Sequence, residues 1–152
     1  MDVYQRLRDC GYSIPEAPKP VASYLPAKQH NDVVYSSGQT GTINGELTFR
    51  GKVANDVSIP DAQQSAKVAV LNCLAAIEIT IGDLNRIAEI VRLTGYVASS
   101  SGFSLQPQVV EGASRLLLDV FGDKGQHARS AIGVAELPSN APVEVELIVR
   151  VA

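Results

Sequence analysis

The sequence predicts one α+β domain in which two long helices cover a single face of a mixed β-sheet. The first observation is apolar spacing of helical period over residues 58–82 and again after Pro107. The second is the order of elements, in which strand-like segments come before, between and after these helices without a strict βα alternation, and such an order favours helices gathered on one face. The third is the length of 152 residues, which suits a single domain spanning residues 1–152.

Composition and charge exclude several classes of protein. The chain is 45% hydrophobic and 19% charged, as in an ordinary globular protein. Its net charge of −3 and the lack of a Lys/Arg cluster argue against a nucleic-acid or membrane surface. No continuous apolar run is long enough to span a bilayer, and the first residues do not resemble a secretion signal. Cys10 and Cys73 lack CxxC spacing, so we expect a cytoplasmic protein with Cys73 in the core.

The first part of the chain is expected to form an accessory helix and two strands. Residues 1–20 read as a short helix after Asp2, followed by a proline-rich connector. A first strand is predicted over residues 21–30 and a second over 33–37, with a short hairpin over 43–53. The second strand runs into SGQTG, where small hydroxyl groups and backbone donors can hold a substrate or simply make a turn.

Clear end signals mark the first long helix. Ser58 is a good N-cap, Pro60 and Asp61 suit the first turn, and Gly82 suits the end. A strand is predicted over residues 87–98 before the second helix. Because the two helices cover only one face of the sheet, the other face would expose apolar residues, and we expect an oligomer to bury it, with small-molecule sites at subunit boundaries.

Residues 127–152 are predicted to form a β-hairpin. In its first run Arg129 shares a face with Ala131 and Gly133, which leaves space beside a fixed positive charge. In its second run Glu144 lies on the polar face. If the two runs pair, about six residues at ~3.4 Å each separate Arg129 from Glu144, or roughly 20 Å. We therefore expect a site to combine Arg129 of one subunit with Glu144 of its neighbour.

Common site motifs are missing from the sequence. His30 and His127 are isolated and do not suggest a metal site, so no metal is expected. There is no P-loop, no GxGxxG and no GxSxG elbow. The residues that remain as candidates for a site are Tyr24, Ser37, the backbone at Gly38, Arg129 and Glu144.

Four segments resemble the RidA/YjgF family, also labelled L-PSP endoribonuclease or imine deaminase. They are VVYSSGQTG at 33–41, NCLAAI at 72–77, ARSAIGVAELP at 128–138 and VEVELIV at 143–149. The resemblance covers roughly residues 20 to 151 and implies a chorismate-mutase-like α+β fold assembled as a homotrimer. The N-terminal helix and the loop over 46–55 are longer than in short members, so the chain resembles a longer subgroup.

The resemblance also assigns roles to the candidates. Arg129 matches the arginine that binds the substrate carboxylate, and Glu144 matches the glutamate that activates water. Tyr24 matches a tyrosine lining the cleft, and Ser37 with Gly38 matches the pair at its floor. The chain departs from the family at three positions, where cysteine, glutamate and asparagine are frequent: Ala131, Gly133 and Glu111.

The implied reaction is hydrolysis of a 2-imino acid, such as 2-iminobutanoate or 2-iminopropanoate, or its enamine tautomer. The products are a 2-oxo acid and ammonia, and neither a metal nor another cofactor is expected. An alternative from another class is a non-catalytic trimer that binds 2-oxo acids or related metabolites as a regulator. A third, endoribonuclease activity, follows the family label but conflicts with the acidic charge balance.

Overall fold

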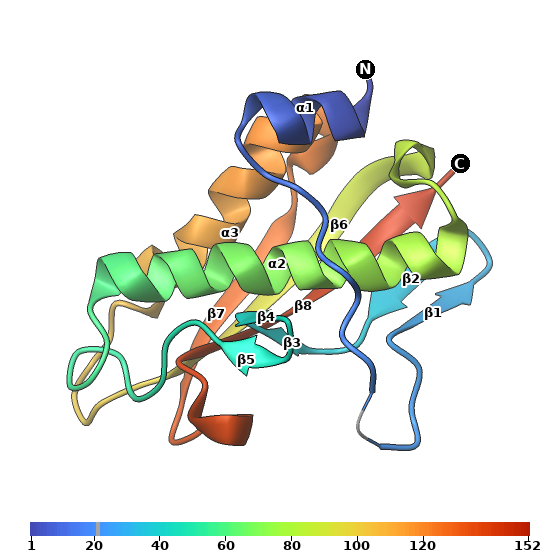
Figure 1. The fold of residues 1–152 in the computed structure, drawn as a ribbon. Helices are drawn as coiled ribbons and strands as arrows, with labels where there is room; N and C mark the ends of the chain where they lie inside the picture. Colours follow the sequence, from blue (N-terminus) through green and yellow to red (C-terminus); the bar gives the residue numbers. More distant parts are fainter. Residues whose placement is uncertain (21) are drawn as a thin grey trace.

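A computed structural model describes residues 1–20 and 22–152 as one sheet with helices packed against it (Figure 1). The sheet has the strand order β1-β2-β8-β6-β7, and β3 also pairs with β8. The strands of the sheet are β1 (Ala27–His30), β2 (Val33–Ser36), β3 (Gln39–Thr40), β6 (Ile87–Ala98), β7 (Ala128–Val134) and β8 (Val143–Val151). The helices are α1 (Val3–Asp9), α2 (Ile59–Ile81) and α3 (Gln106–Phe121), with short 3-10 turns at Leu84–Arg86, Gly122–Gly125 and Pro138–Asn140.

Both long helices lie on the same face of the sheet, as predicted (Figure 1). α2 packs on β8, β2 and β3, while α3 packs on β6 and β7. The predicted ends of α2 are confirmed: the Ser58 hydroxyl accepts a hydrogen bond from the Asp61 N–H at 3.2 Å, and Gly82 takes a left-handed conformation with φ 86°. The buried residues of β8 face these helices, because Val143, Val145, Leu147 and Val149 have no exposed area.

The predicted terminal hairpin is wrong. β6 lies between β7 and β8, pairing with β7 in parallel and with β8 in antiparallel orientation. The physical reason is the connection through α3: a strand, a helix and a second strand form a crossover, which places the two strands parallel in one sheet. The 3-10 turn over residues 138–140 therefore carries the chain past β6 and does not close a tight turn.

The first part of the chain departs from the prediction in its boundaries: the second strand ends at Ser36, and the hairpin predicted over 43–53 spans residues 42–47. The first strand begins at Ala27, whereas we predicted residues 21–30, of which residue 21 lies outside the described part. The predicted hairpin after β3 is present as β4 (Thr42–Ile43) paired with β5 (Glu46–Leu47). This hairpin stands apart from the main sheet as a small second sheet.

α2 also has the length and apolar composition of a membrane-spanning helix. However, 67% of its most apolar window is buried inside the protein, as in the core helix of a folded domain. Its buried residues include Cys73, which is fully covered, with Sγ 3.4 Å from the Val145 carbonyl oxygen. Burial raises the pKa of the Cys73 thiol to about 12, which leaves it unreactive and confirms it as a core residue.

The face of the sheet without helices is more polar than predicted. Exposed apolar side chains on it include Tyr35 (46% exposed) and Ile132 (47%). The register places them beside polar side chains, because Ile132 pairs with Tyr96, and Tyr96 pairs with Glu144 on its other side. This face therefore presents apolar and polar side chains side by side. That an oligomer buries it stays a prediction.

Candidate functional site

Glu144 lies in β8, in the part of the strand that pairs with β3 and no longer with β2. Thr40 of β3 is its register partner, and Gly38 precedes that strand. A Cβ atom built on Gly38 would lie 2.5 Å from Oε2 of Glu144, closer than real contacts allow. Position 38 must therefore be glycine for the carboxylate to rest directly on the backbone.

The gap between β2 and β3 is closed by side chains that sequence reasoning did not select. The buried Ser36 hydroxyl accepts a hydrogen bond from the Leu147 N–H at 2.9 Å, in place of a backbone carbonyl. Asn72 of α2 donates from Nδ2 to the carbonyl oxygens of Thr40 (3.0 Å) and Thr42 (2.9 Å). A buried asparagine on an otherwise apolar helix face was the available signal, since a buried amide needs partners.

A cavity of about 820 Å³ opens beside Glu144. Two of the predicted residues, Tyr24 and Gly38, line it together with Glu144. Ser37 does not line it: its hydroxyl donates to the Leu25 carbonyl oxygen at 2.6 Å, and its N–H donates to the Pro26 carbonyl oxygen at 2.8 Å. The structure thus brings three of the five candidates to one cavity and gives Ser37 a structural role beside it.

The environment of Glu144 favours its protonated form. Burial raises the pKa of this carboxyl, and the nearby Glu146 carboxylate raises it further. Glu146 itself accepts a hydrogen bond from the Tyr96 hydroxyl at 2.9 Å. Within the part of the chain that the structure describes, Glu144 has no hydrogen bond or ion pair of its own. A partly buried carboxyl group without a partner, beside a cavity, is a candidate acid or base.

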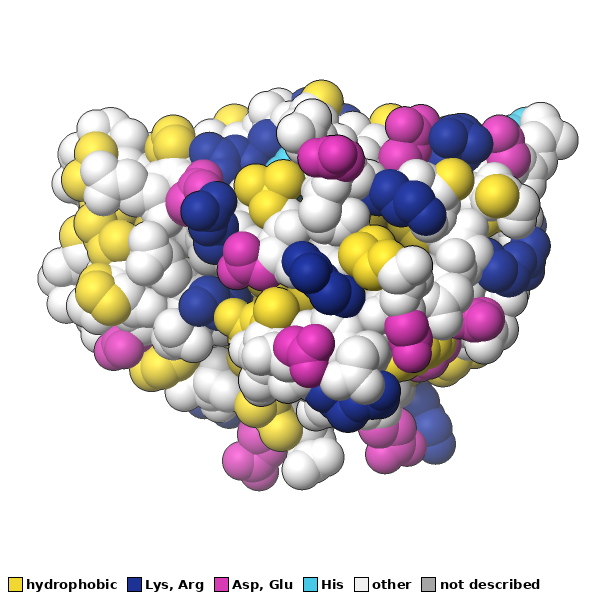
Figure 2. All heavy atoms as spheres, turned by 90° about the horizontal axis from the view of Figure 1, so that it is seen from above, with side chains coloured by type: hydrophobic (Ala, Val, Ile, Leu, Met, Phe, Trp, Pro, Cys, Tyr) yellow, Lys and Arg dark blue, Asp and Glu magenta, His cyan; other side chains and the backbone are white. Residues whose placement is uncertain are grey.

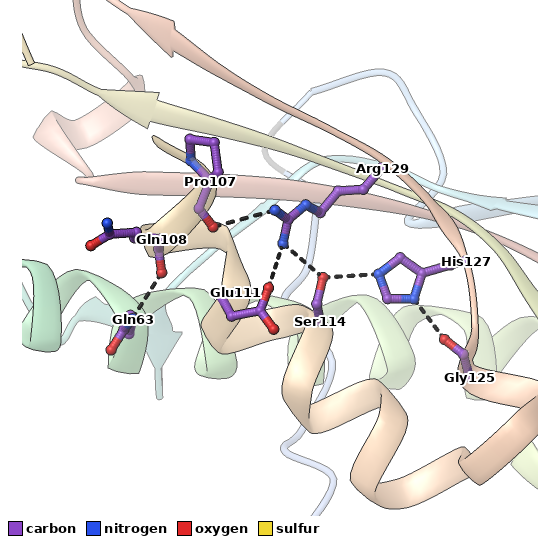
Figure 3. Close-up of polar contacts among 8 residues, drawn as sticks. All are labelled: Gln63, Pro107, Gln108, Glu111, Ser114, Gly125, His127 and Arg129. Carbon is purple, nitrogen blue, oxygen red and sulfur yellow. Dashed lines mark hydrogen bonds and ion pairs between the residues drawn. The ribbon is translucent and has the colours of Figure 1, made fainter. Parts of the chain in front are cut away.

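Arg129 points away from this cavity, toward α3 (Figure 3). Its Nη1 donates to Oε2 of Glu111 at 3.0 Å and to the Ser114 hydroxyl at 3.1 Å, while Nη2 donates to the Pro107 carbonyl oxygen at 3.4 Å. Its side chain is 23% exposed. The guanidinium is therefore held in one orientation, and Glu111 balances part of its charge.

His127, immediately before β7, supports this arrangement (Figure 3). Nδ1 of His127 lies 2.6 Å from the Gly125 carbonyl oxygen, so it carries the proton and donates. Nε2 then accepts from the Ser114 hydroxyl at 2.9 Å, which directs the serine lone pairs toward Arg129. These side chains border a second cavity of about 290 Å³.

The space beside Arg129 is not made by the small residues that the sequence singled out, because Ala131 and Gly133 do not line the cavity of about 290 Å³. A Cβ on Gly133 would lie 2.7 Å from Nε2 of Gln106, at the start of α3. Gly95 of β6, the register partner of Ala131, has no room for a Cβ either, because Val110 of α3 lies against it. The tiny side chains let α3 approach the sheet closely, which is a packing role.

Arg129 and Glu144 lie far apart within one chain. Leu93 of β6 is the register partner of Arg129 and Tyr96 that of Glu144, three residues further along. With two strand spacings of ~4.8 Å and a rise of ~3.3 Å per residue, their Cα atoms are roughly 14 Å apart. They also occupy opposite faces, because Leu93 is buried under the helices while Tyr96 lies on the helix-free face.

Titratable side chains do not gather into a metal site. Among residues 1–20 and 22–152, no group of three or more His, Cys, Asp or Glu side chains is placed to hold an ion. The groups that line the Glu144 cavity include its own carboxyl group with a raised pKa, the hydroxyl groups of Tyr12 and Tyr24, and the charged side chains of Glu16 and Lys19.

Comparisons with known proteins place this geometry in context. Residues 4–151 match a family model described as "YjgF/chorismate_mutase-like, putative endoribonuclease". Protein TCP17 of Trypanosoma cruzi is 34% identical, covering 97% of this chain and 93% of TCP17. A 2-iminobutanoate/2-iminopropanoate deaminase of Dermatophagoides farinae is 30% identical, covering 90% and 92%. The crystal structure of Atu1372 from Agrobacterium tumefaciens, a protein of unknown function, is 37% identical with a TM-score of 0.92, covering 99% and 92%.

Proposed function

The chain belongs to the YjgF/chorismate-mutase-like family, and from this premise we propose that it hydrolyses reactive 2-imino acids to 2-oxo acids and ammonia. The observation that carries the proposal is the carboxyl group of Glu144, which faces a cavity of about 820 Å³ with a raised pKa and without a partner among the described residues. A relative named as a 2-iminobutanoate/2-iminopropanoate deaminase supports the same reaction class.

Glu144 supplies the proton transfers of this reaction. Its carboxylate removes a proton from water as the oxygen adds to the C=N carbon, and the imine nitrogen gains a proton to give a carbinolamine. Glu144 then takes the hydroxyl proton of the carbinolamine and passes a proton to the amine nitrogen, so that the C–N bond breaks, the C=O bond forms, and the products are the 2-oxo acid and ammonia. A base with a pKa raised toward neutral suits this work, and such catalysis contributes about 10²–10⁴-fold.

Arg129 binds the substrate carboxylate from a neighbouring copy of the chain. One chain cannot place both groups on one ligand, since the two side chains lie on opposite faces of the sheet with Cα atoms roughly 14 Å apart. A second copy, packed against the helix-free face, would bring its Arg129 to the rim of the Glu144 cavity. Tyr24 and Gly38 then form the walls on the Glu144 side.

Mixing two inactive variants tests this shared site. Arg129→Ala and Glu144→Gln are each expected to abolish turnover of freshly generated imines. Co-assembly of the two in equal amounts restores activity at roughly one quarter of the sites, because one interface in four pairs an intact arginine with an intact glutamate. Mixed assemblies without activity, from variants that keep the fold and the oligomeric state, would contradict a site shared between copies.

A regulatory, non-catalytic role has its own supporting observation. Glu111 binds Arg129 at 3.0 Å, so an incoming carboxylate must compete with an internal one. A metabolite sensor would show saturable 2-oxo-acid binding that depends on Arg129, without imine turnover. Measuring binding and turnover on the same preparation separates the two functions.

The distribution of charge on the surface gives less support to ribonuclease activity. On the side that Figure 2 shows, acidic and basic side chains are interspersed and no broad basic patch is formed. The net charge is −3, whereas RNA-binding surfaces combine clustered positive charge with stacking aromatics. RNA cleavage that persists through purification and disappears in Glu144→Gln would support this function instead.

A further inference from the structure

The connector between α1 and β1 forms one wall of the cavity that contains Glu144. Residues 11–13 and 15–19 line it, and Figure 1 shows this segment crossing α2 on its way to the edge of the sheet. The same residues were expected to be only an accessory element. The cavity of about 820 Å³ lies in the upper part of the ~300–1,000 Å³ range of small-molecule sites.

The connector is fixed in place from its N-terminal end. Val3 and Leu7 of α1 are 3% and 2% exposed and belong to the core. The Tyr4 hydroxyl donates to Oε1 of Glu78 at 2.7 Å and accepts from the Leu84 N–H at 3.0 Å. The Tyr12 N–H then donates to the Leu7 carbonyl oxygen at 2.8 Å, where the connector starts. These contacts fix the start of the connector, at Tyr12, beside the cavity.

Part of the cavity wall is apolar. Tyr12, Pro15, Ala17 and Pro18 line it from the connector, and Leu71 lines it from α2. The rest of the lining is polar or charged and includes the exposed Glu16 and Lys19 of the connector, with Gln39, Thr40 and Asn44. A ligand with an apolar side chain buries it against the apolar part of this wall while its reactive end lies at Glu144.

We propose that the connector makes the cavity selective for 2-imino acids, and their 2-oxo products, that carry a bulky apolar side chain such as that of leucine or phenylalanine. The assignment rests on the proposed function for the reactive end of the ligand. A short acid would leave most of the space to water, whereas a branched or aromatic side chain buries apolar surface against the connector. Each methylene accommodated changes specificity by about 10-fold or more.

Turnover provides the first measurement. Imines are generated in situ by an amino-acid oxidase from alanine, 2-aminobutyrate, leucine and phenylalanine, and kcat/KM is determined for each. We expect the two bulky imines to exceed the two short ones by at least about tenfold. Ala17→Phe, which fills the cavity from the connector, lowers this ratio by at least about tenfold. Ala135→Phe, an equal change at an exposed position outside the cavity, leaves the ratio as in the wild type.

Calorimetric binding of the matching 2-oxo acids separates this inference from the proposed reaction. If no imine is hydrolysed but the bulky 2-oxo acids bind more tightly and Ala17→Phe removes the difference, the deaminase proposal fails and the selectivity stands. Equal or weaker binding of the bulky acids overturns the selectivity, even if short imines are hydrolysed. A preference for bulky acids that Ala17→Phe does not change overturns the role of the connector.

Discussion

The two charged candidates, Arg129 and Glu144, lie in opposite kinds of surroundings. Arg129 has three acceptors within 3.4 Å, all on α3, and one of them is a carboxylate. Glu144 rests on the bare backbone of Gly38, and burial raises the pKa of its carboxyl. The guanidinium of Arg129 is satisfied within its own chain, whereas the Glu144 carboxyl has no polar partner among the described residues. Under the proposed function, this contrast suits Glu144 to proton transfer and Arg129 to orienting the ligand.

The largest effect is expected from Glu144→Gln. The substitution keeps the shape but removes the base, so kcat for imine hydrolysis falls by about 10²–10⁴-fold. It also removes the repulsion between the carboxyl groups at positions 144 and 146, so the melting temperature stays the same or rises. Steady-state kinetics and thermal unfolding measure both. Glu136→Gln, at an exposed side chain that pairs with Lys52 at 3.5 Å, is the matched control and keeps full activity.

Gly38→Ala is expected to have the next largest effect. The new Cβ would lie 2.5 Å from Oε2 of Glu144, so the carboxylate must shift from its present position. A displacement of about 1 Å can lower a rate about 10²-fold, and we expect a loss of that order in kcat. Ser37→Ala, next to it but outside the cavity lining, should change kcat much less. Equal losses in the two variants would mean that the loop, rather than the contact with Glu144, matters.

The sequence predicted the helices well because their signals are local. Ser58 and Gly82 mark the ends of α2 through a side-chain cap and a left-handed φ, which depend only on neighbouring residues. The pairing of β7 was predicted wrongly, because alternation of side chains in a strand does not say which strand lies beside it. A signal was available: residues 87–98, a helix and residues 128–134 have the order of a parallel crossover unit.

The site was predictable only in part for a similar reason. Small residues beside Arg129 are compatible with space for a ligand and with close approach of a helix, and sequence cannot distinguish these. In the structure, a Cβ atom on Gly133 would lie 2.7 Å from Nε2 of Gln106, so the glycine serves the close approach of α3. Conversely, Tyr12 and Ala17 carry no recognisable motif, and only the path of the connector brings them to the cavity of Glu144.

A smaller effect, on the binding of 2-oxo acids, is expected when the ion pair between Arg129 and Glu111 is removed. Glu111→Gln removes the carboxylate that lies 3.0 Å from Nη1, so an incoming 2-oxo acid meets less competition. Partly exposed ion pairs contribute about 0.2–1 kcal/mol, which predicts binding roughly 1.4- to 5-fold tighter. Calorimetric titration measures it. Asp119→Asn, on the same helix but beside Arg115, is the control. Weaker binding in Glu111→Gln would show that the glutamate instead orients the arginine for the ligand.

The smallest effect concerns pH and tests the surroundings of Glu144 directly. Activity that needs the carboxylate is lost as the pH falls through the raised pKa of Glu144. Glu146→Gln removes the nearby negative charge and lowers that pKa, so the acid limb of the pH–rate profile moves to lower pH. Part of the rise in the pKa of Glu144 remains in this variant, because burial is the larger cause and is unchanged.

The free energy of unfolding should also depend on pH through the Glu144 carboxyl group, but in the opposite direction to activity. Because the pKa of Glu144 is raised on folding, the folded state holds this proton more tightly, and the stabilisation is present at low pH and lost as the pH rises through the raised value. In Glu146→Gln the loss starts at the same pH, near the pKa of the unfolded chain, but it is complete at a lower pH and is smaller. Thermal unfolding across this pH range measures it, with Glu89→Gln, whose carboxylate pairs with Arg150 at 2.9 Å, as the control. The pH–rate profile could contradict this assignment, if its acid limb moved to higher pH in Glu146→Gln. Glu146, held by the Tyr96 hydroxyl, would then stabilise the carboxylate form of Glu144, and Glu144 would be a weaker base than its surroundings indicate.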